Sequence, residues 1–481
     1  MGHPQFRGEK GMRKDMDGPP ATEVRSKGHL LRILGVSFGV AVIVGNTIGS
    51  GILLTPGEVA AHLHNSWFVI AVWSMGGVFA FLCTQAVSEL GTMLPLAGGW
   101  FVYARRAFGQ FGGFLVGCGD WMVQSVAIAY LTVAFGEFAA GMQPALLGRT
   151  KLVDVACLVV LMLLNWLGLR AGSRVQQISS LTKALALISF VVACFVVTPR
   201  AAPSSVVVPQ SLPQIPLSGL LVALIVALQP IVVSYDGWYG AIYFTEEDEN
   251  PAKNLPRSSL LGVLACAAIF LLVNAALLHV LSIGRLAASQ MPAADAAELI
   301  FGVHGRNMIL LVSLVTAISA INASLMITPR ILFAMARDGQ MPGWITWVNS
   351  GGTPAGALLL CTAVPIALVL SGSFTALVAM DSILFVAVYL SGFLSLFVLR
   401  AREHDYPRPF KMWGYPWTNL GICLGAGAFL VASIIADLKH ALFTVVVIAL
   451  TSSLYLSMRK MRRSREARHE GIQLTPDTEE K

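Results

Sequence analysis

Charged side chains are scarce in this chain of 481 residues. Asp, Glu, Lys and Arg make up 12% of it, whereas hydrophobic residues make up 56%. A soluble domain carries roughly 25% charged residues, so this composition excludes an ordinary soluble protein. Apolar runs of about 20 residues recur along the whole sequence, and each is long enough to cross a bilayer as a helix. The sequence therefore predicts an all-α membrane protein.

Functional motifs of several other protein classes are also missing. No cleavable signal peptide precedes the first apolar run, and no P-loop or HExxH motif occurs. The seven Cys residues fall inside apolar runs and form no CxxC pair. His62, His64, His279 and His304 lie at the ends of these runs without metal-ligand spacing. We therefore expect no enzyme, no cofactor, no metal site and no disulfide-linked heavy chain.

The apolar runs predict twelve membrane-spanning helices. Alternating polarity of the kind found in outer-membrane strands is absent, which favours a helical bundle. The predicted spans cover residues 33–62, 67–94, 112–143, 152–169, 177–198, 217–248, 257–282, 305–337, 355–371, 375–399, 418–437 and 441–458.

The chain has a net charge of +7, and the distribution of its Lys and Arg residues predicts its orientation in the membrane. Short loops after even-numbered spans carry about twice as many of them as loops after odd-numbered spans, and positive loops stay in the cytoplasm. We therefore expect a multi-pass protein of the cell (inner) membrane, with both termini, residues 1–32 and 459–481, in the cytoplasm. Residues 1–32 and 464–481 are polar and predicted to be unstructured. The basic segment 459–468 is expected to lie at anionic lipid, and nucleic-acid binding is not predicted.

Two predicted spans are interrupted at their centres by polar and glycine-rich stretches. The first span carries GNTIGSG at 45–51, and the sixth carries SYDGWYG at 234–240, with Pro230 one turn upstream. In hydrocarbon, unwound backbone is tolerated only where it lines a cavity or is buried in protein. Paired interruptions in corresponding helices indicate the binding site of a transporter. The alternative is that the glycines serve only close helix packing.

These interruptions predict two five-helix units of opposite orientation, residues 33–198 and 217–399, followed by two helices within 417–458. The half-helix at 51–62 would begin with free N–H groups and a partial positive charge, which suit a carboxylate. The preceding half-helices, about 33–45 and 218–233, would end in free carbonyls, which suit an ammonium group. Both groups together describe an α-amino acid.

Five stretches resemble one transporter family. GNTIGSGILLTPG is similar to the first-helix signature of the amino acid–polyamine–organocation (APC) superfamily, and SYDGWYGAIYFTEEDENPAKNLPRS to the sixth-helix signature of its L-type amino acid transporter-like branch. Segments 88–109, 165–176 and 322–342 agree with the same family. The resemblance covers about residues 33–430 and implies a LeuT-like fold, in which helices 1 and 6 are broken and helices 11 and 12 are added.

The resemblance also implies roles for residues at the two breaks. Backbone N–H groups of Gly49, Ser50 and Gly51 would bind the substrate carboxylate, with help from the Ser50 hydroxyl. The substrate amine would be bound by the carbonyls of Thr47, Val233 and Asp236.

The sixth-helix stretch departs from the family pattern at two positions. Val233 stands where the family often has an aromatic gate, and Tyr239 stands where many relatives have Asn. Trp238, Tyr239 or Tyr235 would cover the substrate instead. Asp236 either faces a cationic or polar substrate side chain, takes part in proton exchange, or caps the half-helix that follows it.

Lys183 is a charge inside the predicted fifth span. At about 1.5 Å per residue it lies roughly 10 Å from the start of that span, and such residues usually have a function. Its position resembles that of a lysine in sodium-independent relatives, which implies a bridge from the first helix to Ser319 and Asn322 on the eighth. In this position Lys183, with Ser319 and Asn322, would serve ion or proton coupling, since a buried lysine can also accept a coupled proton. The alternative is a lysine that snorkels to the interface.

Acidic residues also stand near the expected cytoplasmic ends of the spans. Glu246 and Glu247 follow the sixth span, on the same predicted side as Arg330 and Arg337, and also Arg105 and Arg106. They either form an inner-gate network of ion pairs or are solvated loop charges. Glu89 and Arg170 allow the same two interpretations.

The sequence therefore predicts a sodium-independent amino acid transporter that works by alternating access, as a proton symporter or an exchanger. Its expected partners are an amino acid substrate and the lipid bilayer. The alternatives are an amino-acid sensor that does not transport and a polyamine permease, whose substrate lacks a carboxylate. A membrane enzyme would need a catalytic cluster that the sequence does not contain.

Overall fold

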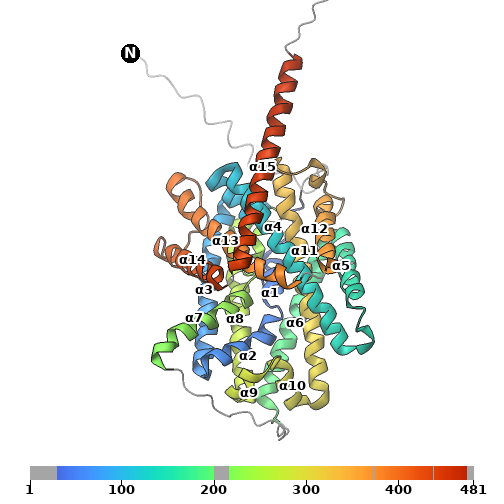
Figure 1. Cartoon of the computed structure of the whole chain (residues 1–481), viewed down its shortest axis with the longest axis vertical. Coiled ribbons are helices and arrows are strands. Elements are labelled where there is room, and N and C mark those ends of the chain that lie inside the picture. Colours follow the sequence, from blue (N-terminus) through green and yellow to red (C-terminus); the bar gives the residue numbers. More distant parts are fainter. Residues whose placement is uncertain (1–29, 200–215, 372–373, 437, 474–481) are drawn as a thin grey trace, which may run out of the picture.

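The computed structural model describes residues 30–199, 216–371, 374–436 and 438–473, and the described chain is a bundle of helices (Figure 1). The first half contains α1 (Val36–Thr47), α2 (Gly51–Leu63), α3 (Ser66–Met93), α4 (Trp100–Met142), α5 (Thr150–Trp166) and α6 (Leu169–Val196). The second half contains α7 (Leu217–Ser234), η2 (Gly240–Phe244), α8 (Pro251–Val280), α9 (Ile283–Ala288), α10 (Pro292–Phe301), α11 (Gly305–Arg337), α12 (Ala355–Ser371) and α13 (Phe374–Arg402). The chain continues through α14 (Trp417–Ala436) and α15 (Leu438–Gln473).

Many of these helices are long and apolar enough to cross a membrane. Within the described residues seven qualify alone, and the bent pair α1 and α2 makes an eighth. The shorter apolar segments Val222–Ser234 and Ala355–Ser371 also match predicted spans. An all-α membrane protein is therefore confirmed, and each predicted range overlaps a helix or a broken pair. The full count of twelve spans stays a prediction.

The first and sixth spans are both interrupted. Between α1 and α2 the axis bends by 47° at residues 48–50. Helix α7 ends at Ser234, and a turn leads into the short 3-10 helix η2. One detail differs from the sequence interpretation. The predicted sixth span continues to residue 248, whereas η2, its helical part after the break, is 3-10 in form and stops at Phe244.

The broken helices lie among the long unbroken ones. Helix α1 packs against α6, α8 and α11, whereas α2 packs against α7 and α9. Helix α4 contacts both α11 and α13 along its length and bends at Gly109, where φ is +79°. The unwound segments are thus surrounded by protein, as unpaired backbone in an apolar environment requires.

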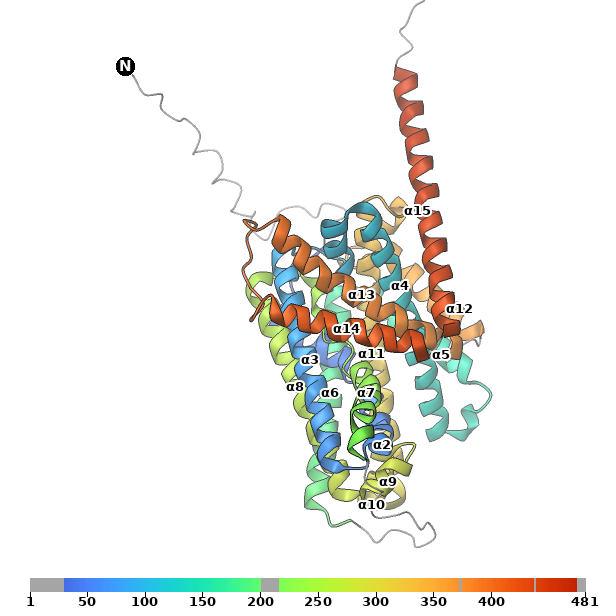
Figure 2. The ribbon, with the colours of Figure 1, turned by 60° about the vertical axis from the view of Figure 1, so that its left-hand side comes forward.

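The structure contains helical segments that were not predicted. The loop between the seventh and eighth spans folds into α9 and α10. Helix α15 continues to Gln473 and stands out from the bundle (Figure 2). The expectation that residues 464–473 are unstructured is therefore wrong. The sequence RSREARHE in this part is rich in Arg and Glu, which have high helix propensity. Most of tail 1–32 and residues 474–481 lie outside the described residues.

Candidate functional site

The two interruptions touch each other through their backbones. Gly237 lies in the turn after α7 with φ at +107°, a conformation that L side chains rarely adopt. A Cβ atom on Gly237 would lie 2.6 Å from the carbonyl carbon of Asn46 and 2.6 Å from the nitrogen of Thr47. Glycine is therefore required where the sixth span meets the unwound part of the first.

The start of α2 offers backbone donors. Among the described residues, the N–H groups of Ser50, Gly51 and Ile52 have no acceptor. The N–H of Gly49, in contrast, donates to the carbonyl of Thr47 at 2.9 Å. Two of the three predicted carboxylate donors are therefore free at a helix N-terminus, and the third is engaged within the break.

The three carbonyls predicted to bind the substrate amine differ in the hydrogen bonds that they already accept. The carbonyl of Thr47 accepts from Gly49, and that of Val233 accepts from the N–H of Asp236 at 3.1 Å. The carbonyl of Asp236 accepts no backbone hydrogen bond within the described chain. The carbonyl of Val233 also accepts from the N–H of Tyr235, which uses both of its lone pairs, whereas the carbonyl of Thr47 can still accept a second donor.

Lys183 is completely buried and faces the break of the first span. Its ammonium group donates to the carbonyls of Gly45 and Ile48, each at 2.7 Å. These carbonyls lie on either side of the point where the helix unwinds, so Lys183 supplies hydrogen bonds that the interrupted helix cannot. A side chain with no exposed surface does not snorkel to an interface.

Ser319 and Asn322 reach the first span indirectly. Gln176 and Ser180 of α6 both donate to the carbonyl of Ala41. Ser319 lies 3.3 Å from the Ser180 hydroxyl, and Asn322 donates to the side chain of Gln176 at 2.8 Å. Gln176 and Ser180, and not Lys183 itself, therefore join the first span to Ser319 and Asn322 of α11.

Gln176 and Ser180 were missed by the sequence analysis. Together with Lys183 they follow the i, i+4, i+7 spacing of one helix face. A polar stripe of this kind in an apolar helix is a signal that could have found them.

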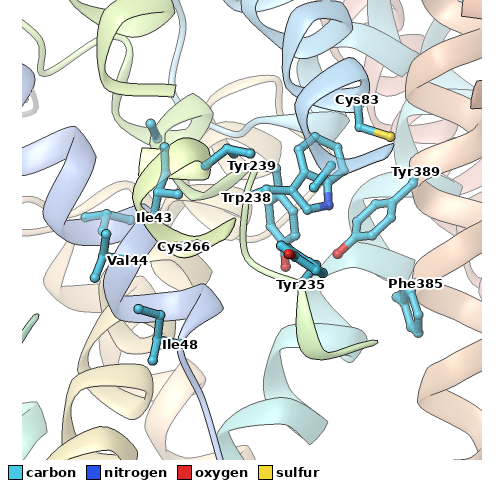
Figure 3. Close-up of a cluster of buried hydrophobic side chains, with 14 of the residues drawn as sticks. Ile43, Val44, Ile48, Cys83, Tyr235, Trp238, Tyr239, Cys266, Phe385 and Tyr389 are labelled. Carbon is cyan, nitrogen blue, oxygen red and sulfur yellow. The ribbon is translucent and has the colours of Figure 1, made fainter. Parts of the chain in front are cut away.

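The three aromatic residues of the sixth-span break face different ways (Figure 3). Tyr235 donates to the carbonyl of Trp73 at 3.0 Å and packs in the core beside α3 and α8. Trp238 and Tyr239 instead pack against Tyr389 of α13, with ring centroids 5.6 Å and 5.1 Å away. Trp238 and Tyr239 therefore form a shared aromatic cluster with Tyr389, whereas Tyr235 packs on the α3 side and lines the same cavity as Trp238.

The carboxylate of Asp236 accepts a 2.5 Å hydrogen bond from the Tyr389 hydroxyl. It does not cap the following helix, because the position before η2 is occupied by Tyr239. Asp236, Trp238 and Tyr389 line a cavity of about 340 Å³ between α3, α7, α13 and α14. The rest of its lining is mostly apolar, so the cavity can accept an apolar group beside one carboxylate.

At one end of the bundle the predicted ion-pair network is present. Arg330 pairs with Glu247 through two hydrogen bonds of 2.5 and 2.8 Å, and both side chains are buried. Glu246 pairs with Arg337, and Glu89 pairs with Arg400. Solvated loop charges are therefore the wrong interpretation for Glu247 and Glu89, which have no exposed surface. Arg105 and Arg106 pair elsewhere, with Asp338 and Glu403, and Arg170 is exposed.

We expect the Arg330–Glu247 pair to control stability. In Arg330→Ala, Glu247 stays buried without its partner, which costs about 3–5 kcal/mol. The melting temperature of the purified protein should fall clearly. Arg106→Ala breaks an exposed pair worth about 0–1 kcal/mol and serves as the control. An equal loss in both variants would contradict this interpretation of the pair.

The sequence profile described as amino acid permease matches residues 34–454. The chain belongs to the amino acid permease family. This permease is 26% identical over 440 residues to a serine/threonine exchanger of Bacillus subtilis (strain 168), an alignment that covers 90% of this chain and 98% of that protein. It is 26% identical over 407 residues to the b(0,+)-type amino acid transporter 1 of Mus musculus, with 83% of this chain and 82% of that protein covered. It is 29% identical over 415 residues to the large neutral amino acids transporter small subunit 2 of Rattus norvegicus, with 82% and 76% covered.

The membership confirms the resemblance to APC transporters that the motifs indicated. It supports amino acid transport across a membrane as the function of this permease and excludes an enzyme. The family match spans both interrupted helices and Lys183, so the geometry described above lies within the part of the chain that the relatives share.

Proposed function

We propose that this permease is a sodium-independent transporter of neutral α-amino acids that works by alternating access, as a proton symporter or an exchanger. The substrate carboxylate binds the free N–H groups of Ser50 and Gly51, and the amine binds carbonyls of the two breaks, including that of Asp236. The substrate side chain extends past Trp238 into the apolar cavity. The names of the relatives, a serine/threonine exchanger and a large neutral amino acids transporter, support a neutral substrate.

The proposed sodium independence is supported by the position of Lys183. Its ammonium group binds two carbonyls of the unwound first helix, Gly45 and Ile48, at 2.7 Å each. A side-chain ammonium group bound to this backbone would fill the role that a coupling ion has at broken helices. Transport should therefore proceed equally in sodium and in choline buffers.

We also propose the full LeuT-like topology for this chain. Residues 33–198 and 217–399 form the two inverted five-helix repeats, and residues 417–458 contribute the two last helices. The contact between the two breaks at Gly237 supports this arrangement. The protein would lie in the cell (inner) membrane, with both termini in the cytoplasm. No disulfide-linked partner is expected, since all seven Cys residues lie within helices.

The decisive experiment is uptake of labelled amino acids into proteoliposomes. The panel of substrates should be run with and without internal amino acid, sodium and a pH gradient. Uptake that requires internal amino acid indicates exchange, and uptake driven by the pH gradient indicates symport. Binding without uptake of any amino acid would favour a sensor instead, and uptake of polyamines alone would favour a polyamine permease.

Ser50→Pro tests the carboxylate site directly. The φ angle of Ser50 is −65°, which proline adopts, so the change removes one N–H with little strain. A hydrogen bond to a charged group is worth about 1.5–3 kcal/mol, so we expect KM to rise by about 10- to 100-fold. Ser50→Ala keeps the N–H and should show a much smaller rise. Unchanged KM in Ser50→Pro would exclude this N–H as a ligand.

A further inference from the structure

A buried carboxyl group without a cationic partner among the described residues lies apart from the substrate site described above. Asp120 belongs to α4, and only 1% of its surface is exposed. Both of its carboxylate oxygens lie 2.9 Å from the hydroxyl of Tyr243, which is itself completely buried in η2. Within the described part of the chain, no Lys, Arg or His pairs with Asp120. Asp120 does not line the cavity beside Asp236.

This environment favours a carboxyl group that carries a proton. Burial of an ionised carboxylate costs several kcal/mol unless a cation or several donors compensate. One phenol hydroxyl is a single donor, so Asp120 lacks this compensation. A protonated carboxyl can instead donate to the Tyr243 oxygen, and the observed distances fit that arrangement equally well.

The neighbouring elements supply no charge that would replace the missing partner. On α11, Arg330 and Arg337 are bound to Glu247 and Glu246. Asp154 of α5 lies farther along α4, beside Gly136. The other titratable groups around Asp120 and Tyr243 are Tyr103 of α4, Asp236 and Tyr239 of the turn after α7, Tyr389 of α13 and the Cys361 thiol of α12 next to Trp121.

The hydrogen bond between Asp120 and Tyr243 joins an interrupted span to a long continuous helix. Tyr243 lies in the short helix that follows the break of the sixth span, whereas Asp120 lies on the long helix α4. The Tyr243 ring also packs directly on Gly99, just before α4 begins. Any displacement of η2 away from α4 therefore breaks this contact and admits water to the carboxyl group.

We propose that Asp120 is a proton-binding site that couples amino acid movement to movement of a proton. The carboxyl group keeps its proton while η2 is packed on α4, and it releases the proton to water when the two separate. Intramembrane acids in proton-driven carriers act in this way. This inference rests on the proposed transport function and selects proton coupling within it.

The test uses full-length protein in proteoliposomes and an equimolar mixture of carbon-14-labelled L-amino acids as the probe. For wild type, an inward pH gradient should raise accumulation by up to about tenfold per pH unit. In Asp120→Asn, which mimics the protonated state, the gradient should have no effect, whereas exchange of internal for external label persists. Tyr243→Phe should reduce the effect of the gradient. Asp154→Asn, another buried acid, is the matched control and should respond as wild type does.

Infrared difference spectra of the purified protein supply a second measurement that needs no transport. One component of the protonated-carboxyl band at neutral pH should be missing in Asp120→Asn and retained in Asp154→Asn. Exchange without any effect of the gradient in wild type would overturn the inference and leave the transport function intact. A gradient effect that persists in Asp120→Asn but is lost in Asp236→Asn would also overturn it. Folded protein that moves no label in either mode would overturn both.

Discussion

Lys183→Ala is expected to reduce uptake at least about tenfold, the factor that corresponds to 1.4 kcal/mol. The change removes two charge-assisted hydrogen bonds and leaves the carbonyls of Gly45 and Ile48 buried without a donor. Each unsatisfied group costs about 1–3 kcal/mol, so the unwound first helix should lose its geometry. Initial rates of uptake into proteoliposomes measure the effect, and size-exclusion profiles verify folding.

Lys151→Ala is a matched control for this variant. Its ammonium group also donates to a backbone carbonyl, that of Leu370 at 3.0 Å, but the side chain is exposed at the edge of the bundle. Uptake by Lys151→Ala should equal that of wild type. Sodium-independent uptake that remains normal in Lys183→Ala would show that the buried ammonium group is not needed at the break.

Gly237→Ala is expected to abolish transport and to lower thermal stability. The added methyl group would overlap the backbone of Asn46 and Thr47, and neither backbone can yield as a flexible side chain can. The positive φ of +107° adds strain of about 1–2 kcal/mol. The two unwound segments must separate to admit the methyl group, which displaces the carbonyls and N–H groups of the site.

Gly148→Ala separates backbone strain from the steric overlap. Gly148 also has a positive φ, +82°, but a Cβ atom there would meet open space. Gly148→Ala should therefore lose only the strain energy and retain uptake. Equal melting temperatures and equal uptake in the two variants would show that the breaks do not depend on their close approach.

The sequence predicted the positions of the two interruptions because each needs residues that are rare inside apolar helices. Glycines at 45, 49 and 51 and the run SYDGWYG stand out against their surroundings. The burial of Lys183 was predictable for the same reason, since a charge in hydrocarbon requires partners. Apolar length alone located the helices.

Other parts of the site depend on tertiary packing that no local pattern shows. Tyr235 and Trp238 are three residues apart, yet one packs toward α3 and the other toward α13. The importance of Gln176 arises from its contact with Ala41, which is 135 residues away in sequence. The partner of Asp120 likewise comes from a distant segment, so its isolation could not be recognised before the fold was known.

The chain that enters α1 is also joined to the chain that leaves η2. The N–H groups of Ile33 and Leu34 donate to the carbonyl of Glu247, and the N–H of Glu249 donates to the carbonyl of Leu34, at 2.9–3.0 Å. Since these bonds use only main-chain atoms, side-chain substitutions leave them in place. The segment before α1 and the segment after η2 should therefore move together. A single crosslink between these two segments should leave the transport cycle unhindered.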